Sequence, residues 1–367
     1  MSAQTTGPVL IVGTGLLGTS IGMALRRLGV EVELADASPS ALALARDMGA
    51  GMIAHEGVDP ALVVVATPPD VTARVIDEAL REHPRAIVTD VASVKTIIAR
   101  ELEACGADTT RYVGSHPMAG RERSGAGAAD ADLFRQRPWV IAPVAGSAER
   151  AIRIVRSLAL DVGALPLDYR AEDHDAAVAC VSHVPQLMAS LLAASLTRAP
   201  QEALGLSGQG LRDSTRIAHS DPRLWAAIVG GNSREIAEVL RGISRDLLDL
   251  LHSLDSAAGD PLAPGLVAQV TKVLEAGNDG VERIPGKHGG APRRYAEVSV
   301  LVPDTPGHLG RLFTELGEAD VNIEDFALEH SAGAPMGVGR VLVDPAAAAP
   351  ARAWLTDHGW TVLDGAH

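Results

Sequence analysis

A single histidine lies in a stretch that could carry acid–base chemistry. His116 stands between a serine and a proline in the stretch from Gly114 to Gly125, whose glycines and Ser124 favour a loop over a helix interior. Residues 111–114 are typical of a strand, so His116 should lie where a strand passes into a loop. Ligands bind at that edge of an open α/β sheet, and histidine, with an ordinary pKa of about 6.5, is the usual general base near neutral pH. We therefore take His116 as a candidate general base, with a structural histidine beside a loop proline as the alternative.

A second stretch with a chemical signature is Gly13-Thr14-Gly15-Leu16-Leu17-Gly18. It follows an apolar run and precedes a helical pattern, the setting that the dinucleotide-binding fingerprint requires. The first glycine allows a tight turn, the second lets the backbone approach a pyrophosphate, and the third lets the helix pack on the strand. The helix N-terminus then faces the phosphate charge. The predicted cofactor contacts are Gly13, Gly15, Leu16, Leu17 and Gly18.

A carboxylate and a threonine extend this predicted cofactor site. Asp36 ends a predicted strand, 30–35, about 20 residues beyond the last glycine, where an acidic residue binds the ribose 2′-hydroxyl. Its charge would repel a 2′-phosphate, so NAD is predicted rather than NADP. The alternative role of Asp36 is to cap the helix that starts near Ser38. Thr67 follows another predicted strand, 62–66, and is expected at the same sheet edge.

The elements that would position these residues alternate between strand and helix over residues 1–170. Apolar runs predict strands over 9–12, 30–35, 62–66, 86–90 and 139–142. This alternation is typical of βαβ units and predicts a Rossmann-type, doubly wound parallel sheet. Thr67, Ser93 and His116 each follow a strand, so the three side chains can converge on one crevice.

Residues 171–285 show helical patterns only, and we predict an all-helical domain that dimerises and closes over the substrate. Its most apolar part, 176–196, is interrupted by polar residues and a proline, which favours a buried helix pair over a membrane span. Arg216 lies between a glycine-rich loop and Trp225. This setting distinguishes Arg216 from an ordinary surface arginine, which is the alternative.

The last part of the chain has a different organisation. Residues 286–294 are rich in glycine, proline and basic residues and are predicted to form a linker. Residues 295–367 show strand and helix patterns in the order βαββαβ, which is typical of a ferredoxin-like domain.

Composition narrows the class of protein. The formal net charge of −14 argues against nucleic acid or an anionic membrane as a partner. Two cysteines, Cys105 and Cys180, provide no disulfide framework and fit a reducing cytoplasm. The N-terminus lacks the basic region of a signal peptide. We expect a cytoplasmic enzyme without a metal.

Five motifs in this order resemble the prephenate/arogenate dehydrogenase family of tyrosine biosynthesis. The motifs are Gly13-Thr14-Gly15-Leu16-Leu17-Gly18, Asp90-Val91-Ala92-Ser93-Val94-Lys95, Ser115-His116-Pro117-Met118-Ala119-Gly120, Val181-Ser182-His183-Val184-Pro185, and Thr215-Arg216-Ile217-Ala218 with Trp225. The resemblance covers roughly residues 8–285. It implies NAD-dependent oxidative decarboxylation of prephenate to 4-hydroxyphenylpyruvate by a homodimer.

The resemblance also implies roles for individual residues. His116 would bond the ring hydroxyl of the substrate and take its proton, Ser93 would orient His116, and Arg216 would bind a substrate carboxylate. Further substrate contacts are expected from Glu122, Ser182, Gln186 and Trp225. Some prephenate-specific members have histidine where this chain has Gln186, so the choice between prephenate and arogenate, or activity on both, stays open.

The turn Asp304-Thr305-Pro306-Gly307-His308-Leu309, with Val321-Asn322-Ile323, resembles an ACT domain, a small module that binds amino acids at subunit interfaces. The implied effector is L-tyrosine, held by Gly307, His308, Leu309 and Asn322, and a plain ferredoxin-like packing domain is the alternative. Two other functions would share the first and last domains. One is another ACT-linked dehydrogenase, and the other is a non-enzymatic NAD sensor.

Overall fold

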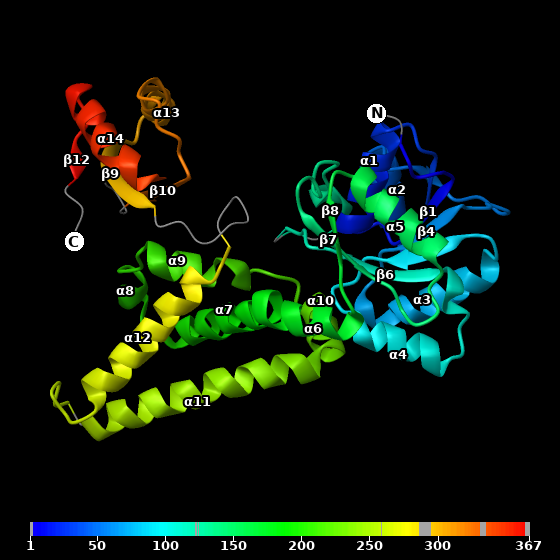
Figure 1. Ribbon diagram of the computed structural model, residues 1–367, viewed down its shortest axis with the longest axis horizontal. Coiled ribbons are helices and arrows are strands. Elements are labelled where there is room, and N and C mark those ends of the chain that lie inside the picture. The colour runs from blue at the N-terminus through cyan, green and yellow to red at the C-terminus, as the bar shows by residue number, and fades with distance from the viewer. Residues whose placement is uncertain are drawn as a thin grey trace. The chain divides into compact units, whose positions relative to one another are not determined.

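The computed structural model describes residues 3–121, 123, 125–257, 259–285, 295–330 and 335–363. The predicted linker, 286–294, and the candidate Glu122 lie outside the described residues. The chain divides into two compact units, each described by itself below (Figure 1). The first unit is Met1–Leu204 with Asp213–Ile243, and the second is Gly205–Arg212 with Ser244–His367.

In the described part of the first unit, eight strands form one sheet in the order β3-β2-β1-β4-β5-β6-β7-β8. They are β1 (Val9–Val12), β2 (Val32–Ala35), β3 (Met52–Ile53), β4 (Leu62–Val65), β5 (Ile87–Asp90), β6 (Tyr112–Pro117), β7 (Pro138–Ala142) and β8 (Leu165–Asp168). Strands β1 to β6 are parallel, as predicted. Strand β7 runs antiparallel to β6, and β8 is parallel to β7. The prediction of a parallel sheet therefore holds for six strands, to which two reversed strands are added.

Helices cover both faces of this sheet. One core contains Val9 and Ile11 with side chains from α1 (Leu16–Arg27), α2 (Pro39–Asp47) and α5 (Glu149–Asp161). The other contains Leu10 with side chains from α3 (Pro69–Glu82), α4 (Thr96–Ala104) and α10 (Pro222–Gly231). Successive residues of a strand point to opposite faces, and a sheet covered on both faces needs apolar residues at both. This explains the continuous apolar runs and confirms the doubly wound fold.

From the end of β8 to residue 285 the described chain is helical, as predicted. Its elements are α6 (Ala171–Val178), a π-helical turn (Ala179–His183), α7 (Val184–Ser195), α8 (Gln201–Leu204), α9 (Gln209–Thr215), a 3₁₀ turn η5 (Arg216–Ala218), α10, α11 (Ser233–Ala257) and α12 (Leu266–Glu282). The predicted boundary at residue 170 falls between β8 and α6, although the compact first unit continues past it.

The helical run Ala171–Arg198 is long and apolar enough to cross a membrane by length and composition. Two of its polar residues, His174 and Asp175, are buried, and Asp175 bonds to backbone N–H groups of the sheet domain. This contact ties the start of the run to the sheet domain. Only 33% of its apolar window is buried, so the buried helix pair expected over residues 176–196 stays a prediction.

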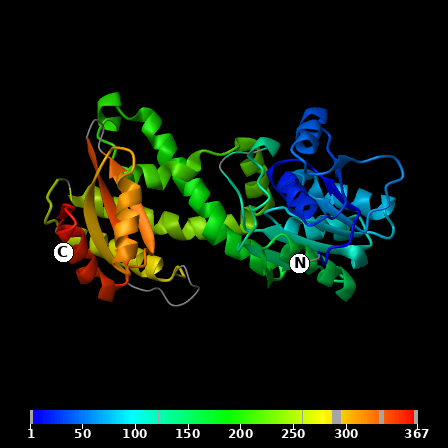
Figure 2. The ribbon, with the colours of Figure 1, turned by 90° about the horizontal axis from the view of Figure 1, so that it is seen from above.

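The C-terminal part of the second unit has the predicted βαββαβ order (Figure 2). It comprises β9 (Ala296–Pro303), α13 (His308–Glu318), β10 (Asp325–His330), β11 (Met336–Val343), α14 (Pro345–Asp357) and β12 (Val362–Leu363). The strands pair antiparallel in the order β10-β11-β9-β12, which is the ferredoxin-like topology. Val298 and Val300 of β9 form a core with Leu312 and Leu316 of α13 and Leu355 of α14.

Candidate active site

The glycine-rich loop between β1 and α1 has the geometry that a dinucleotide needs. Gly13 has φ +103°, and a Cβ there would lie 2.4 Å from the carbonyl oxygen of Ala66. A Cβ on Gly18 would lie 2.0 Å from the Gly13 carbonyl oxygen, so α1 could not pack so closely on the strand. A Cβ on Gly15 would meet nothing within 4 Å, which leaves the backbone open to a ligand. Helix α1 begins at Leu16 without a side-chain cap, so its first N–H groups can face a phosphate. The loop therefore fits NAD.

Asp36 lies at the end of β2 beside this loop. Its Oδ2 accepts hydrogen bonds from the backbone N–H of Thr14 at 2.6 Å and from the Thr14 hydroxyl at 2.8 Å. Its Oδ1 accepts from the backbone N–H of Ser38 at 2.7 Å, whereas the N-cap of α2 is Ser38 itself. Thr67 follows β4, and its hydroxyl lies 3.0 Å from that of Thr72. Asp36 is therefore a carboxylate tied to the glycine loop rather than the cap of α2.

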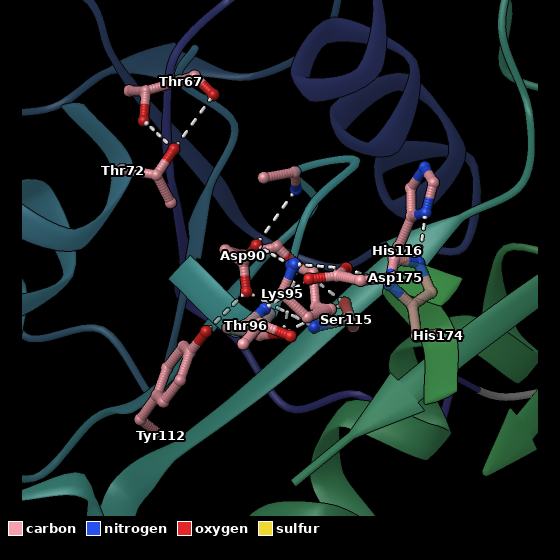
Figure 3. A network of polar contacts seen from close by, with 12 residues as sticks. Thr67, Thr72, Asp90, Lys95, Thr96, Tyr112, Ser115, His116, His174 and Asp175 are labelled. Carbon is pink, nitrogen blue, oxygen red and sulfur yellow. Dashed lines mark hydrogen bonds and ion pairs between the residues drawn. The ribbon is translucent and has the colours of Figure 1, made fainter. Parts of the chain in front are cut away.

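His116 is the next-to-last residue of β6 and is paired with Val140 of β7. Its Nδ1 lies 2.9 Å from Nε2 of His174, and the two rings are nearly perpendicular at 82°. Nδ1 of His174 in turn lies 2.8 Å from Oδ1 of Asp175, so the three side chains form one row (Figure 3). His116 is 8% exposed and His174 and Asp175 are each 1% exposed. Burial, followed by the nearby His174, Lys95 and His183, holds the pKa of His116 well below its usual value.

Asp175 joins the first helix after the sheet domain to the sheet domain itself. Its Oδ1 accepts the backbone N–H of Lys95 at 2.9 Å, and its Oδ2 accepts that of Thr96 at 2.8 Å. Both N–H groups belong to the start of α4, where an anion is favourable. Burial acts to raise the pKa of Asp175, but the hydrogen bonds from His174, Thr96 and Lys95 together hold it below its usual value.

A buried charge network lies beside this row. The amine of Lys95, itself 3% exposed, forms an ion pair with Oδ2 of Asp90, and the hydroxyl of Tyr112 donates to Oδ1 of Asp90 at 2.8 Å. The hydroxyl of Ser115 donates to the Asp90 carbonyl at 2.7 Å. Burial and then the Asp90 charge raise the pKa of Tyr112 well above its usual value. The network fixes the carboxyl ends of β5 and β6 relative to each other.

Ser93 is half-buried in the loop between β5 and α4. Among the hydrogen bonds of the described residues, His116 bonds to His174 rather than to Ser93. The orienting role that the resemblance implies for Ser93 thus stays a prediction. Within the same described ranges, no three side chains of His, Cys, Asp or Glu are grouped so as to hold a metal ion.

The helical segment contributes a second group of polar side chains. Gln186 of α7 is buried, and its Nε2 donates to the Ser220 hydroxyl at 2.9 Å. His183 is 1% exposed, lies 3.2 Å from Nδ2 of Asn232 through its Nδ1, and meets Trp225 edge-on at 6.1 Å. Its Nε2 is buried, and no hydrogen-bond partner of this atom is found within the described residues. Burial lowers the pKa of His183 to about 4.

Two of the remaining predicted substrate residues lie in the same helical segment. Ser182 is half-buried in the π-helical turn, which precedes Pro185, a residue without the N–H that an ordinary α-helical turn would use. Arg216 begins η5, which packs against α7, and its side chain is exposed. Glu122 lies outside the described residues. The direct contact of Arg216 with a substrate stays a prediction.

The predicted effector residues lie at one turn of the second unit. Gly307, at φ +94°, is the N-cap of α13 and supplies no side-chain cap. Nδ1 of His308 lies 2.8 Å from the Thr305 hydroxyl, and Leu309 packs against the domain core. Asn322 is exposed and donates its Nδ2 to a Glu324 oxygen at 2.6 Å. An effector role for this turn also stays a prediction.

Sequence reasoning missed several residues that the structure brings to the site. His174 and Asp175 hold His116, Lys95 and Asp90 form the buried ion pair, and His183 lies in the helical group. The adjacent pair His174-Asp175 at the start of a helical pattern was a visible signal, since both residues are costly to bury. Its partner, 58 residues away at His116, was not visible.

Comparison with known proteins identifies two matching domain families. Residues 21–166 match the nucleotide-binding domain of prephenate dehydrogenase, and residues 170–268 match its dimerization domain. A probable prephenate dehydrogenase, NovF of Streptomyces niveus, is 36% identical over 339 residues, which cover 92% of this chain and 94% of that protein. A cyclohexadienyl dehydrogenase of Zymomonas mobilis is 29% identical over 69% of this chain and 90% of that protein. The crystal structure of Aquifex aeolicus prephenate dehydrogenase with hydroxyphenyl propionate and NAD⁺ has a TM-score of 0.64 and 27% identity, covering 76% of this chain and 99% of that one.

Proposed function

Because this chain belongs to the prephenate dehydrogenase family of NAD-dependent oxidoreductases, we propose that it converts prephenate to 4-hydroxyphenylpyruvate in the synthesis of L-tyrosine. The observation that carries this proposal is His116, a buried histidine at the carboxyl end of β6 whose Nδ1 is already bonded to His174. Its Nε2 is then the nitrogen left for a substrate. We take the substrate group to be the ring hydroxyl, as the family resemblance implies.

The reaction requires three things of the protein. It must accept the proton of the 4-hydroxyl, bind the carboxylates, and hold the cofactor against the hydroxyl-bearing carbon. NAD⁺, held by the glycine loop and Asp36, supplies the nicotinamide that accepts the hydride. As the hydride leaves, His116 takes the hydroxyl proton, the ring carboxylate departs as CO₂, and its bonding electrons complete the aromatic ring. The phenolate oxygen regains the proton, so His116 ends the cycle neutral.

Neutral His116 is the form that this step needs. A base must be unprotonated when substrate binds, and the lowered pKa of His116 keeps it so at neutral pH. Arg216 is proposed to bind a substrate carboxylate, because a planar guanidinium can donate two parallel hydrogen bonds to it. In a protein with net charge −14, such a local cation is needed to attract an anionic substrate.

One observation favours arogenate as a second candidate substrate. Arogenate carries an ammonium group where prephenate has a keto oxygen. Nε2 of Gln186 donates to Ser220 at 2.9 Å, and the other atom of the amide, Oε1, can only accept. An ammonium group would donate to that oxygen, whereas a keto group would not.

Both candidates can be tested with one assay. The protein is mixed with NAD⁺ and either prephenate or arogenate, and NADH absorbance is followed. Turnover of prephenate supports the main proposal, and a higher kcat/KM for arogenate supports the second. Gln186→His should shift the ratio toward prephenate, with Gln201→His on the exposed α8 as control. Absence of NADH with both substrates, together with turnover of homoserine or a 3-hydroxy acid, would overturn both candidates.

We also propose a homodimer and a cytoplasmic location. Helix α11 exposes Leu247, Leu251 and Leu254 at helical spacing, and α12 exposes Leu274. A second copy would remove these apolar side chains from water. Two exposed cysteines without a disulfide are consistent with a reducing compartment.

For the C-terminal domain we propose an ACT role with L-tyrosine as effector. Gly307 provides no side-chain cap, so the first N–H groups of α13 are suited to an α-carboxylate. Asn322 has an amide that can both donate and accept.

A further inference from the structure

The hydrogen bond between His116 and His174 joins two imidazole rings, and its partners determine which nitrogen carries each hydrogen. Nδ1 of His174 faces Oδ1 of Asp175 at 2.8 Å. A carboxylate accepts hydrogen bonds and does not donate them. Nδ1 of His174 must therefore carry a hydrogen, and in a neutral ring Nε2 then has a lone pair. Because that Nε2 faces Nδ1 of His116 at 2.9 Å, the hydrogen in this bond must come from His116.

The carboxylate at the end of this row is firmly held in its charged form. Asp175 accepts backbone N–H groups from Lys95 and Thr96, and these donors favour the anion. Asn232 donates to the backbone carbonyl of Asp175 at 2.8 Å and so fixes the start of the helical segment. Asp175 therefore cannot supply the hydrogen that it shares with His174.

The surroundings disfavour a second positive charge on the row. His116 and His174 are both buried, and an imidazolium would lose its hydration there. Lys95 on the side of β5 already brings one buried cation, which Asp90 neutralises. His183 on the helical side adds a further ring that is neutral at pH 7. A neutral pair of imidazoles with hydrogens on both Nδ1 atoms satisfies every contact in the row.

We propose that Asp175 and His174 are positioning residues that hold His116 in its Nδ1–H tautomer, so that Nε2 is the base presented to the substrate hydroxyl. The identity of that hydroxyl rests on the proposed function, but the tautomer does not. When Nε2 takes the proton, Nδ1–H keeps donating to His174. The negative charge of Asp175 then stabilises the positive charge of the imidazolium. Without His174 the hydrogen of His116 could lie on Nε2, and the base would then have no lone pair facing the substrate.

The tautomer can be measured directly in the full-length protein. Histidine side chains are labelled with ¹⁵N, and the shifts of both ring nitrogens are recorded above neutral pH, where the rings are neutral. The His116 signals are assigned by their loss in His116→Asn. We expect the hydrogen on Nδ1 and a lone pair on Nε2. A wild-type spectrum with the hydrogen on Nε2 of His116 would overturn the proposal without any variant.

Two matched variants test the positioning role. His174→Gln keeps an acceptor oxygen for Nδ1–H of His116, whereas His174→Leu has a similar volume and no acceptor. The leucine variant should place hydrogen on Nε2 of His116 and lower kcat by about 10²- to 10⁴-fold, the range for a lost base or a wrong tautomer. The glutamine variant should keep the hydrogen on Nδ1 of His116. Its kcat should be at least about tenfold higher than that of the leucine variant. Equal kcat and unchanged ¹⁵N shifts in both variants would contradict the proposal.

These readouts separate the two hypotheses. If His116 carries its hydrogen on Nδ1 but neither prephenate nor arogenate is oxidised, the proposed function fails and the positioning row stands. If a substrate is oxidised while His116 carries its hydrogen on Nε2, the positioning role of His174 and Asp175 is contradicted and the proposed function is supported. The KM for NAD⁺ should change little in the folded variants, since the row's hydrogen bonds among the described residues go to Lys95 and Thr96 rather than to the glycine loop.

Discussion

Asp36 is joined to Thr14 by two hydrogen bonds, from the backbone N–H at 2.6 Å and from the hydroxyl at 2.8 Å, both to the same carboxylate oxygen. The contact ties the end of β2 to the first turn of the glycine loop. One carboxylate thus shapes the loop and provides negative charge at the predicted ribose site.

Asp36→Asn removes the charge and keeps one acceptor oxygen for Thr14, while its Nδ2 replaces the oxygen that accepts from the Ser38 N–H. We expect the ratio of kcat/KM for NAD⁺ over NADP⁺ to fall at least about tenfold, which corresponds to about 1.4 kcal/mol of lost repulsion. Asp47→Asn, an exposed acid at the end of α2, is the control and should leave the ratio unchanged. Equal values for both cofactors in the wild type would mean that Asp36 only shapes the loop.

His116→Asn should lower kcat by roughly 10²–10⁴, the usual contribution of general base catalysis, while NAD⁺ binding stays near normal. The exposed His55→Asn is the control. Because the pKa of His116 is well below 6.5, wild-type kcat/KM should stay level through neutral pH and fall only at lower pH, as Nε2 becomes protonated. A variant that keeps more than about a tenth of kcat would refute the role of base.

Arg216→Lys should mainly raise KM for the substrate, because lysine keeps the charge but loses the planar fork that binds a carboxylate. Steady-state kinetics at saturating NAD⁺ measure this effect. Arg223→Lys on the exposed side of α10 is the matched control. A lysine variant with wild-type KM would identify Arg216 as an ordinary surface residue.

The lowered pKa of His183 predicts that acid destabilises the folded protein. This pKa is about 4 in the folded chain and about 6.5 in the unfolded chain, so the unfolded state binds more protons between these values. The free energy of unfolding should therefore fall as pH drops from about 6.5 to about 4, by up to about 1.4 kcal/mol per pH unit for this group. Urea titrations of wild type and His183→Gln at several pH values test this. Glutamine does not titrate, and an equally steep fall in the variant would assign the sensitivity to other groups.

L-Tyrosine is expected to inhibit the full chain through the C-terminal domain by coupling to the catalytic dimer. Chains that end near residue 285 should stay active and lose this response, and full-length Asn322→Leu should weaken it. Substrate must be saturating, because tyrosine could also compete in the active site. Equal inhibition of the truncated and full-length chains would show that the C-terminal domain is structural.

Much of the fold was predictable because its signals are local. The alternation of apolar runs with helical patterns predicted the doubly wound sheet, and Gly13, Gly15 and Gly18 predicted the turn that φ +103° at Gly13 confirms. Strand direction was less accessible. The apolar residues of β7 predict a buried strand. They do not indicate whether it runs parallel or antiparallel to β6, because that depends on how the two strands are connected.

The sequence alone determined the chemistry available: a glycine loop with Asp36 beyond it, a histidine at a strand end, and an order of motifs typical of one family. Only the tertiary structure decided how the histidine is held. His116 lies 58 residues from His174, and Asp175 lies 80 residues from the Lys95 N–H that it accepts, so neither contact leaves a local pattern. Each forms because α6 packs against α4 and β7, which places His174 and Asp175 in a buried setting where polar atoms need partners.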